Sequence, residues 1–68
     1  MRMHTYEVEI TRLGHLVKQE IVTGANSFRH ALEMVVTDAD TYIPMQPSTR
    51  TVETYQNGDN LAKVSRFE

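Results

Sequence analysis

Residues 26–36 are the one segment of this chain whose apolar spacing predicts an amphipathic helix. Asn26 or Ser27 supplies a side-chain oxygen that can cap the first turn. The helix should end near residues 38–40, where two aspartates disfavour the negative end of the helix dipole. Strand-like sequence lies on both sides, so this helix has to share its core with a sheet. Its predicted apolar stripe consists of Phe28, Ala31, Leu32, Val35 and Ala39.

Residues 5–11 and 16–23 predict a first antiparallel hairpin. In the first of these segments apolar residues alternate with glutamates, the period-two pattern of a strand with one buried face. A two-residue tip at 13–14 would place Ile10 opposite Val17, and a three-residue loop is the open alternative.

Residues 50–56 and 61–67 predict a second hairpin. Asn-Gly between two β-rich segments is among the strongest local signals for a hairpin turn. A loop centred on Gly58 would place Tyr55 opposite Leu61, so that both faces carry some apolar character. The sequence does not say whether this hairpin joins the first in one sheet.

These elements predict an α+β fold in the order strand-strand-helix-strand-strand, with one amphipathic helix packed on a small, mainly antiparallel sheet. We expect one domain over residues 1–68. A chain of this length buries only about 60% of the surface that its unfolded form exposes. It has no cysteine, which excludes disulfides and thiolate metal sites. We therefore expect a homodimer to supply part of the stability.

The charge balance gives no general attraction to nucleic acids or anionic membranes. Seven Lys and Arg residues face nine Asp and Glu residues, for a net charge of −2. No apolar segment is long enough to span a bilayer, and the first residues have no signal-peptide core. The lack of cysteine is compatible with a reducing compartment. We therefore predict a cytoplasmic protein without a membrane partner.

The sequence shows no constellation of residues for catalysis, a metal or a cofactor. None of the three histidines has a second ligand at zinc spacing, and the glutamates of the first hairpin lie on an open strand face without a desolvated cleft. No nucleophile, base and orienting group can be assembled. We therefore expect a protein that is not an enzyme and that binds no cofactor.

The segment after the helix predicts a protein-binding surface. Pro44 and Pro47 favour extended conformations before them and disfavour regular strand pairing. The apolar side chains nearby exceed what one helix can cover, and methionine and aromatic side chains suit protein contacts. The open alternative is that the segment folds back into the core. The predicted protein-binding residues are Met34, Tyr42, Ile43 and Met45.

Nucleic-acid binding is the alternative function. Basic side chains beside aromatic ones on strands are typical of platforms for single-stranded nucleic acids. On the second hairpin the residues of this kind are Arg50, Tyr55, Lys63 and Arg66.

In size and layout the chain resembles short accessory proteins of bacteriophages and mobile elements. The likeness covers most of the chain and includes two strands, a helix that begins with Ala-Asn-Ser, and two further strands. This resemblance implies an accessory protein or an inhibitor, which works by binding a host protein or by dimerising. The sequence therefore favours a small, non-enzymatic interaction module.

Overall fold

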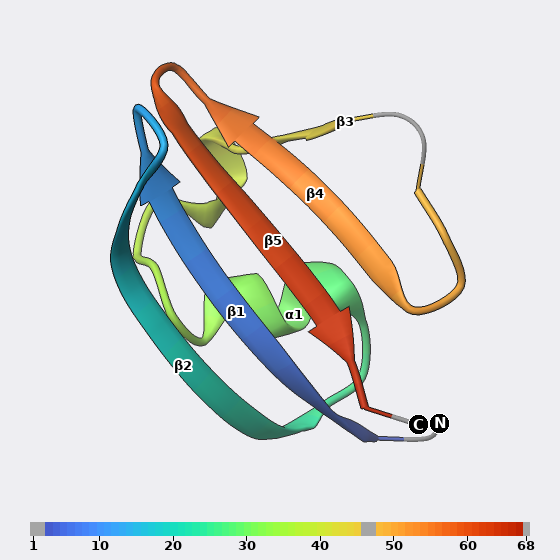
Figure 1. The fold of residues 1–68 in the computed structure, drawn as a ribbon. Coiled ribbons are helices and arrows are strands. Elements are labelled where there is room, and N and C mark those ends of the chain that lie inside the picture. Colours follow the sequence, from blue (N-terminus) through green and yellow to red (C-terminus); the bar gives the residue numbers. More distant parts are fainter. Residues whose placement is uncertain (1–2, 46–47, 68) are drawn as a thin grey trace.

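A computed structural model of the chain describes residues 3–45 and 48–67 (Figure 1). The order of elements is β1 (His4–Arg12), β2 (His15–Ala25), α1 (Phe28–Glu33), a 3₁₀ turn η1 (Ala39–Thr41), β3 (Ile43–Met45), β4 (Val52–Asn57) and β5 (Asn60–Arg66). All strand pairs are antiparallel, and the strands lie in the order β2-β1-β5-β4-β3. The two predicted hairpins therefore join in one sheet through β1 and β5.

The prediction of an α+β fold defined by a helix packed on a sheet is wrong, because the fold is largely β. The helix has six residues, whereas β2 alone has eleven. Ser27 is the N-cap, and its hydroxyl accepts a hydrogen bond of 3.0 Å from the backbone of His30. The helix ends after Glu33, shortly before the β-branched residues 35–37, whose side chains lose rotamer freedom in a helix. A short cap on a five-stranded sheet replaces the longer helix that we expected.

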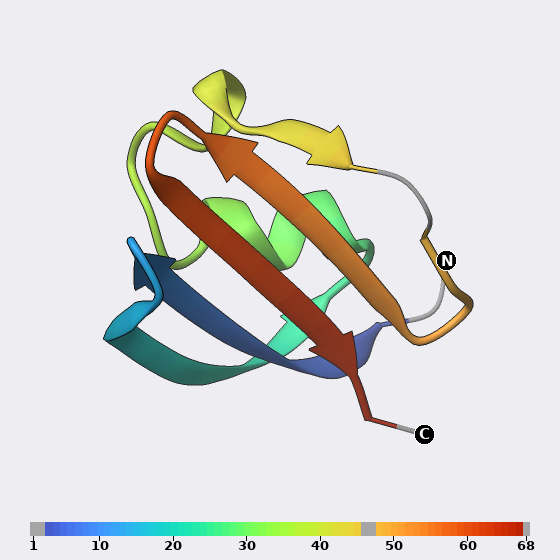
Figure 2. The same ribbon diagram turned by 45° about the horizontal axis from the view of Figure 1, so that its top comes forward.

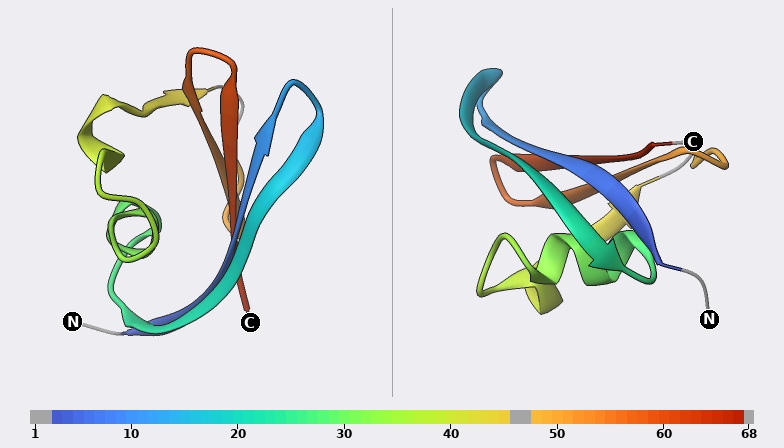
Figure 3. Two further views of the ribbon diagram at one scale, coloured as in Figure 1. Left: turned by 90° about the vertical axis from the view of Figure 1, so that its left-hand side faces the viewer. Right: turned by 90° about the horizontal axis from the view of Figure 1, so that it is seen from below.

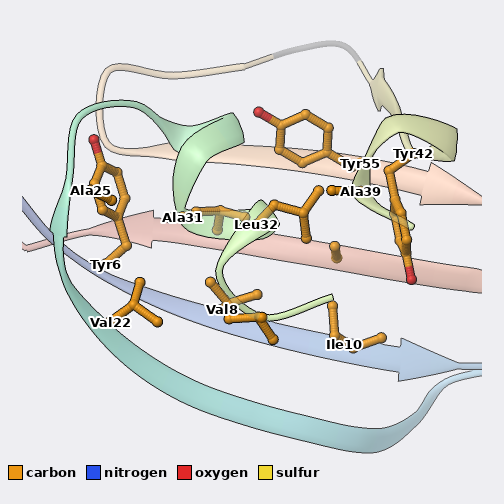
Figure 4. Close-up of a cluster of buried hydrophobic side chains, with 13 residues drawn as sticks. Tyr6, Val8, Ile10, Val22, Ala25, Ala31, Leu32, Ala39, Tyr42 and Tyr55 are labelled. Carbon is orange, nitrogen blue, oxygen red and sulfur yellow. The ribbon is translucent and has the colours of Figure 1, made fainter. Parts of the chain in front are cut away.

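The core lies between one face of the sheet and the short helical segments. We call this face the inner face and the opposite one the outer face. Helix α1 packs against β1, β2 and β5 (Figure 2). Its residues Ala31 and Leu32 are fully buried. From the sheet, Tyr6, Val8 and Ile10 of β1 meet them (Figure 4). Viewed along the sheet, α1 and η1 lie on the same side of it (Figure 3).

The first hairpin has the predicted two-residue tip but a different register. Leu13 and Gly14 form the tip with φ angles of 52° and 83°, the left-handed conformation that such a turn requires at both positions. Ile10 lies opposite Lys18 and Thr11 opposite Leu16, so the residue between these two has no partner. That residue, Val17, is a β-bulge, and it shifts the predicted pairing of Ile10 with Val17 by one residue.

The second hairpin is also shifted by one residue from its predicted register. Its turn consists of Gly58 and Asp59, and Tyr55 lies opposite Ala62 rather than Leu61. Since side chains alternate across a strand, this shift moves Tyr55 from the outer face to the inner face. Tyr55 is 1% exposed and forms part of the core.

Pro44 does not prevent strand pairing. Strand β3 is short and pairs with β4, with Pro44 opposite Tyr55. Because β3 is the last strand of the sheet, the missing N–H of a proline is tolerated there. The other proline of the segment, Pro47, lies outside the described residues.

Leu13 should be replaceable with a gain in stability. A leucine at positive φ is strained, whereas asparagine tolerates this conformation well. We expect Leu13→Asn to raise the free energy of unfolding by about 0.5–1 kcal/mol in urea titrations. Gly14→Ala, in the same turn, should lower it, because alanine is disfavoured at the positive φ of that position. A loss of stability in Leu13→Asn would mean that the leucine side chain supports the fold.

Candidate protein-binding face

A row of side chains crosses all five strands on the outer face. The register places Thr11 between Leu16 and Leu61, and Gln56 between Leu61 and Ile43. Their chain neighbours Ile10 and Ala62 are buried on the inner face, so the row itself points the other way. Among the described residues, no helix or strand covers this face (Figure 3). We call this set the outer row: Leu16, Thr11, Leu61, Gln56 and Ile43.

Leu13 lies at the tip of the first hairpin, between Thr11 and Leu16 of the outer row in the sequence. Its side chain is 70% exposed, although its backbone has the strained positive φ described above. Its N–H donates a hydrogen bond of 3.2 Å to the carbonyl of Asp59, which links the two hairpin turns. Strained residues of this kind often mark functional sites. An exposed apolar side chain at such a position contributes little to folding.

Polar and charged residues flank the outer row. In the next row of the same face, Glu9 lies between Gln19 and Lys63. The side-chain amide of Gln19 donates a hydrogen bond to the carboxylate of Glu7. The face therefore combines a row in which three apolar side chains alternate with two polar ones and a neighbouring row that carries both charges. This arrangement resembles the apolar centre and polar rim of protein interfaces.

A shallow depression lies beside the Ile43 end of the outer row. It has a volume of about 220 Å³, and Thr41, Gln56, Asn57 and Gly58 complete its lining. Asn57 Nδ2 donates hydrogen bonds to Thr41 Oγ1 at 2.9 Å and to Asp38 Oδ2 at 3.3 Å. An exposed apolar residue thus lines a small recess whose other side chains are polar.

The four predicted protein-binding residues do not form one surface. Ile43 is 67% exposed on the outer row, and Met45 is partly buried opposite Thr54. Met34 is 46% exposed but follows helix α1, in the layer that covers the inner face. Tyr42 is 3% exposed and lies in the core, so its ring is not available to a partner. For Tyr42, the structure agrees with the alternative in which the segment after the helix folds back into the core.

Arg29 explains why Tyr42 turns inward. Its guanidinium donates hydrogen bonds to the carbonyls of Ala39, at 2.5 Å, and Tyr42, at 3.0 Å. It also lies over the Tyr55 ring, with Cζ 4.8 Å from the ring centroid. One side chain of α1 therefore holds η1, the start of β3 and the core face of β4 together.

Tyr55 is a buried phenol with a carboxylate partner. Its hydroxyl donates a hydrogen bond to Glu53, which lies two residues earlier on the same strand. Burial, together with the hydrogen bond and charge of Glu53, raises the pKa of Tyr55 well above its ordinary value of about 10. The phenol therefore stays protonated at physiological pH and cannot serve as a general base.

The four residues of the nucleic-acid alternative are dispersed over the fold. Tyr55 lies in the core, and Lys63 lies on the outer face opposite Glu9. Arg66 lies opposite Tyr6, with its guanidinium 6.0 Å from the centroid of the Phe28 ring on the helix side. Arg50 is exposed and precedes β4. They do not form the aromatic and basic platform that stacking of bases requires.

The sequence prediction missed Leu13, Leu16 and Leu61. The sequence pattern places all three in the first and second hairpins, but only the register of the sheet shows that Leu16 and Leu61 share a face with Ile43.

Within residues 3–45 and 48–67, no group of three or more His, Cys, Asp or Glu side chains is placed to hold a metal ion.

We compared the chain with known protein families, curated proteins and solved structures. No protein-family model, curated protein or solved structure matches the chain. None of the helices in the described part of the chain has the length and apolar character needed to cross a membrane.

Arg29→Met should destabilise the protein without changing the outer row. The variant loses two hydrogen bonds from a charged donor to backbone carbonyls, together with the contact over Tyr55. We expect a drop of about 2–3 kcal/mol in the free energy of unfolding, measured by urea denaturation. Arg12→Met is the matched control, because Arg12 is exposed and makes one long hydrogen bond of 3.5 Å to Asn60. Equal losses in the two variants would contradict the role of Arg29.

Proposed function

We propose that this protein is a small, non-enzymatic interaction module that binds another protein through the outer row. The observation that carries the proposal is the line of exposed Leu16, Leu61 and Ile43 side chains across a sheet face with no described covering layer. Burial of apolar side chains is the main source of affinity in protein contacts. The partner surface should be flat and apolar at its centre.

The rows beside the outer row support the same proposal. Glu9 and Lys63 carry opposite charges next to the outer row. Such charges determine the orientation of a partner more than they raise its affinity. Leu13 adds an apolar side chain that is 70% exposed at the tip of the first hairpin. We place the protein in the cytoplasm as part of this proposal, because a chain without cysteine needs no oxidising compartment.

Nucleic-acid binding stays the second prediction from the sequence, but no specific contact favours it. The aromatic residue that it needs is Tyr55, which lies in the core. The test of the proposed function therefore has to separate protein partners from nucleic acid.

Ile43→Asp should weaken partner binding while the fold is retained. A charge at a 67% exposed position of the last strand does not disturb the core, but it opposes an apolar partner surface. The tagged full-length chain captures its partner from a lysate treated with nuclease, and the isolated partner is then titrated. We expect Ile43→Asp to weaken binding about tenfold or more.

Met34→Asp is the matched control, because Met34 is an exposed apolar residue of the helix layer. It should bind as the wild type does. Loss of binding in Met34→Asp together with normal binding in Ile43→Asp would move the site to the helix side. A captured signal that nuclease removes would favour the nucleic-acid alternative.

A further inference from the structure

Strand β2 presents a long free edge. It is the first strand in the sheet order, pairs on one side with β1, and has no strand on its other side among the described residues (Figure 1). Its first seven residues, 15–21, are exposed. The opposite edge of the sheet is the three-residue β3, which contains Pro44. Of the two edges, β2 is the one with the length and the N–H groups to pair with another strand.

Irregularities limit this edge to one straight segment. The bulge at Val17 precedes the segment, and Gly24, at a φ of 78°, follows it near a second register shift. Between these points, residues 18–22 run in regular register with β1. Bulges discourage pairing where they occur, so any added strand should be centred between them.

The charges on this segment select one register for pairing with a second copy of the chain. In an antiparallel pair related by a two-fold axis, opposite residues share a face. One residue must therefore lie opposite its own copy, with the axis between the two, and we name each register by that residue. An axis at Lys18 or Glu20 would place two like charges directly opposite each other, which is destabilising. An axis at Gln19 places Lys18 of each copy opposite Glu20 of the other. An axis at Ile21 would instead place Lys18 opposite Gly24 and Glu20 opposite Val22, so neither charge would have an opposite charge in the other copy.

We propose that two copies of this protein form a homodimer by antiparallel pairing of their β2 strands about Gln19. The two sheets then become one continuous sheet. Because the second copy attaches at the edge, the outer row of each copy stays accessible, and the dimer does not depend on the proposed function.

The side chains that meet in this register are complementary. Lys18 Nζ and Glu20 Oε2 of one copy already lie 3.7 Å apart, and both side chains are half exposed. Lys18 Nζ also donates to the carbonyl of Val35 at 3.2 Å, and an ammonium group has a third donor for the second copy. Outside the paired residues 18–20, exposed Ile21 comes close to exposed Val17 of the other copy, at the bulge, so apolar surface is removed from water as well.

Charge reversal tests the register. In sedimentation equilibrium of the full chain we expect a dimer, and Lys18→Glu or Glu20→Lys alone should weaken dimerisation about tenfold or more, because each places like charges opposite each other twice. An equimolar mixture of the two variants should dimerise again. Each chain of that mixture still lacks its own Lys18–Glu20 ion pair, so only pairing between chains can restore the dimer. A monomeric wild type, unaffected single variants or an unrestored mixture would overturn the proposal.

A crosslink tests the same register without changing a charge. The chain has no cysteine, so Gln19→Cys introduces one thiol that lies opposite its own copy at the two-fold axis. Facing residues of antiparallel strands have Cα atoms about 4.5–5.5 Å apart, within the range of a disulfide. Mild oxidation with a copper–phenanthroline reagent should therefore give a covalent dimer at low protein concentration. Thr23→Cys on the same strand should not crosslink, and equal crosslinking of both variants would contradict the register.

Discussion

The pairing of β1 with β5 is the contact on which the rest of the structure depends. It is the one described link between the two hairpins in the sheet, and it joins segments from the two ends of the described chain. In this pair Val8 lies opposite Val64 and Ile10 opposite Ala62, and all four are buried. The inner face thereby gains a continuous apolar centre, against which α1 packs Leu32. Without this pairing, each hairpin would be an isolated two-stranded unit of marginal stability.

The same pairing creates a face that the short chain does not cover. Six residues of helix and one 3₁₀ turn lie over the inner face, and they leave the outer face of the sheet without a layer in the described structure. Small domains bury a limited share of their surface, so some apolar side chains remain exposed on any such sheet. Here Leu16, Leu61 and Ile43 lie in one row of the register, on β2, β5 and β3, which is why we propose that they bind a partner.

Turn chemistry and the alternation of apolar and polar residues were enough to predict both hairpins. They also predicted the tip at Leu13–Gly14 and an N-cap at Asn26 or Ser27, which in the structure is Ser27. The registers could not, since nothing in the composition of residues 16–23 distinguishes Val17 as the bulged residue. A shift of one residue exchanges the faces of a strand, and for this reason the predicted register pairs Tyr55 with exposed Leu61 rather than with buried Ala62.

The helix and the segment after it differ from the prediction for tertiary reasons. The apolar spacing continues past Glu33 to Val35 and Ala39, and both residues are buried, but they reach the core from turns rather than from a longer helix. Hydrogen bonds from Arg29 to main-chain carbonyls fix that path, and local propensity contains no information about such contacts. Of the predicted binding residues, Ile43 is the one that lies on the outer row.

Paramagnetic relaxation of methyl groups by a soluble gadolinium probe is the most direct test of a sheet that is covered on one face. Leu61 and Val64 lie on the same strand and face opposite sides, so they serve as an internal comparison. The structure predicts strong relaxation of the Leu61 and Ile43 methyl groups and little for Val64 and Val8. Equal protection of Leu61 and Val64 would contradict the account, because a second layer would then cover the outer face.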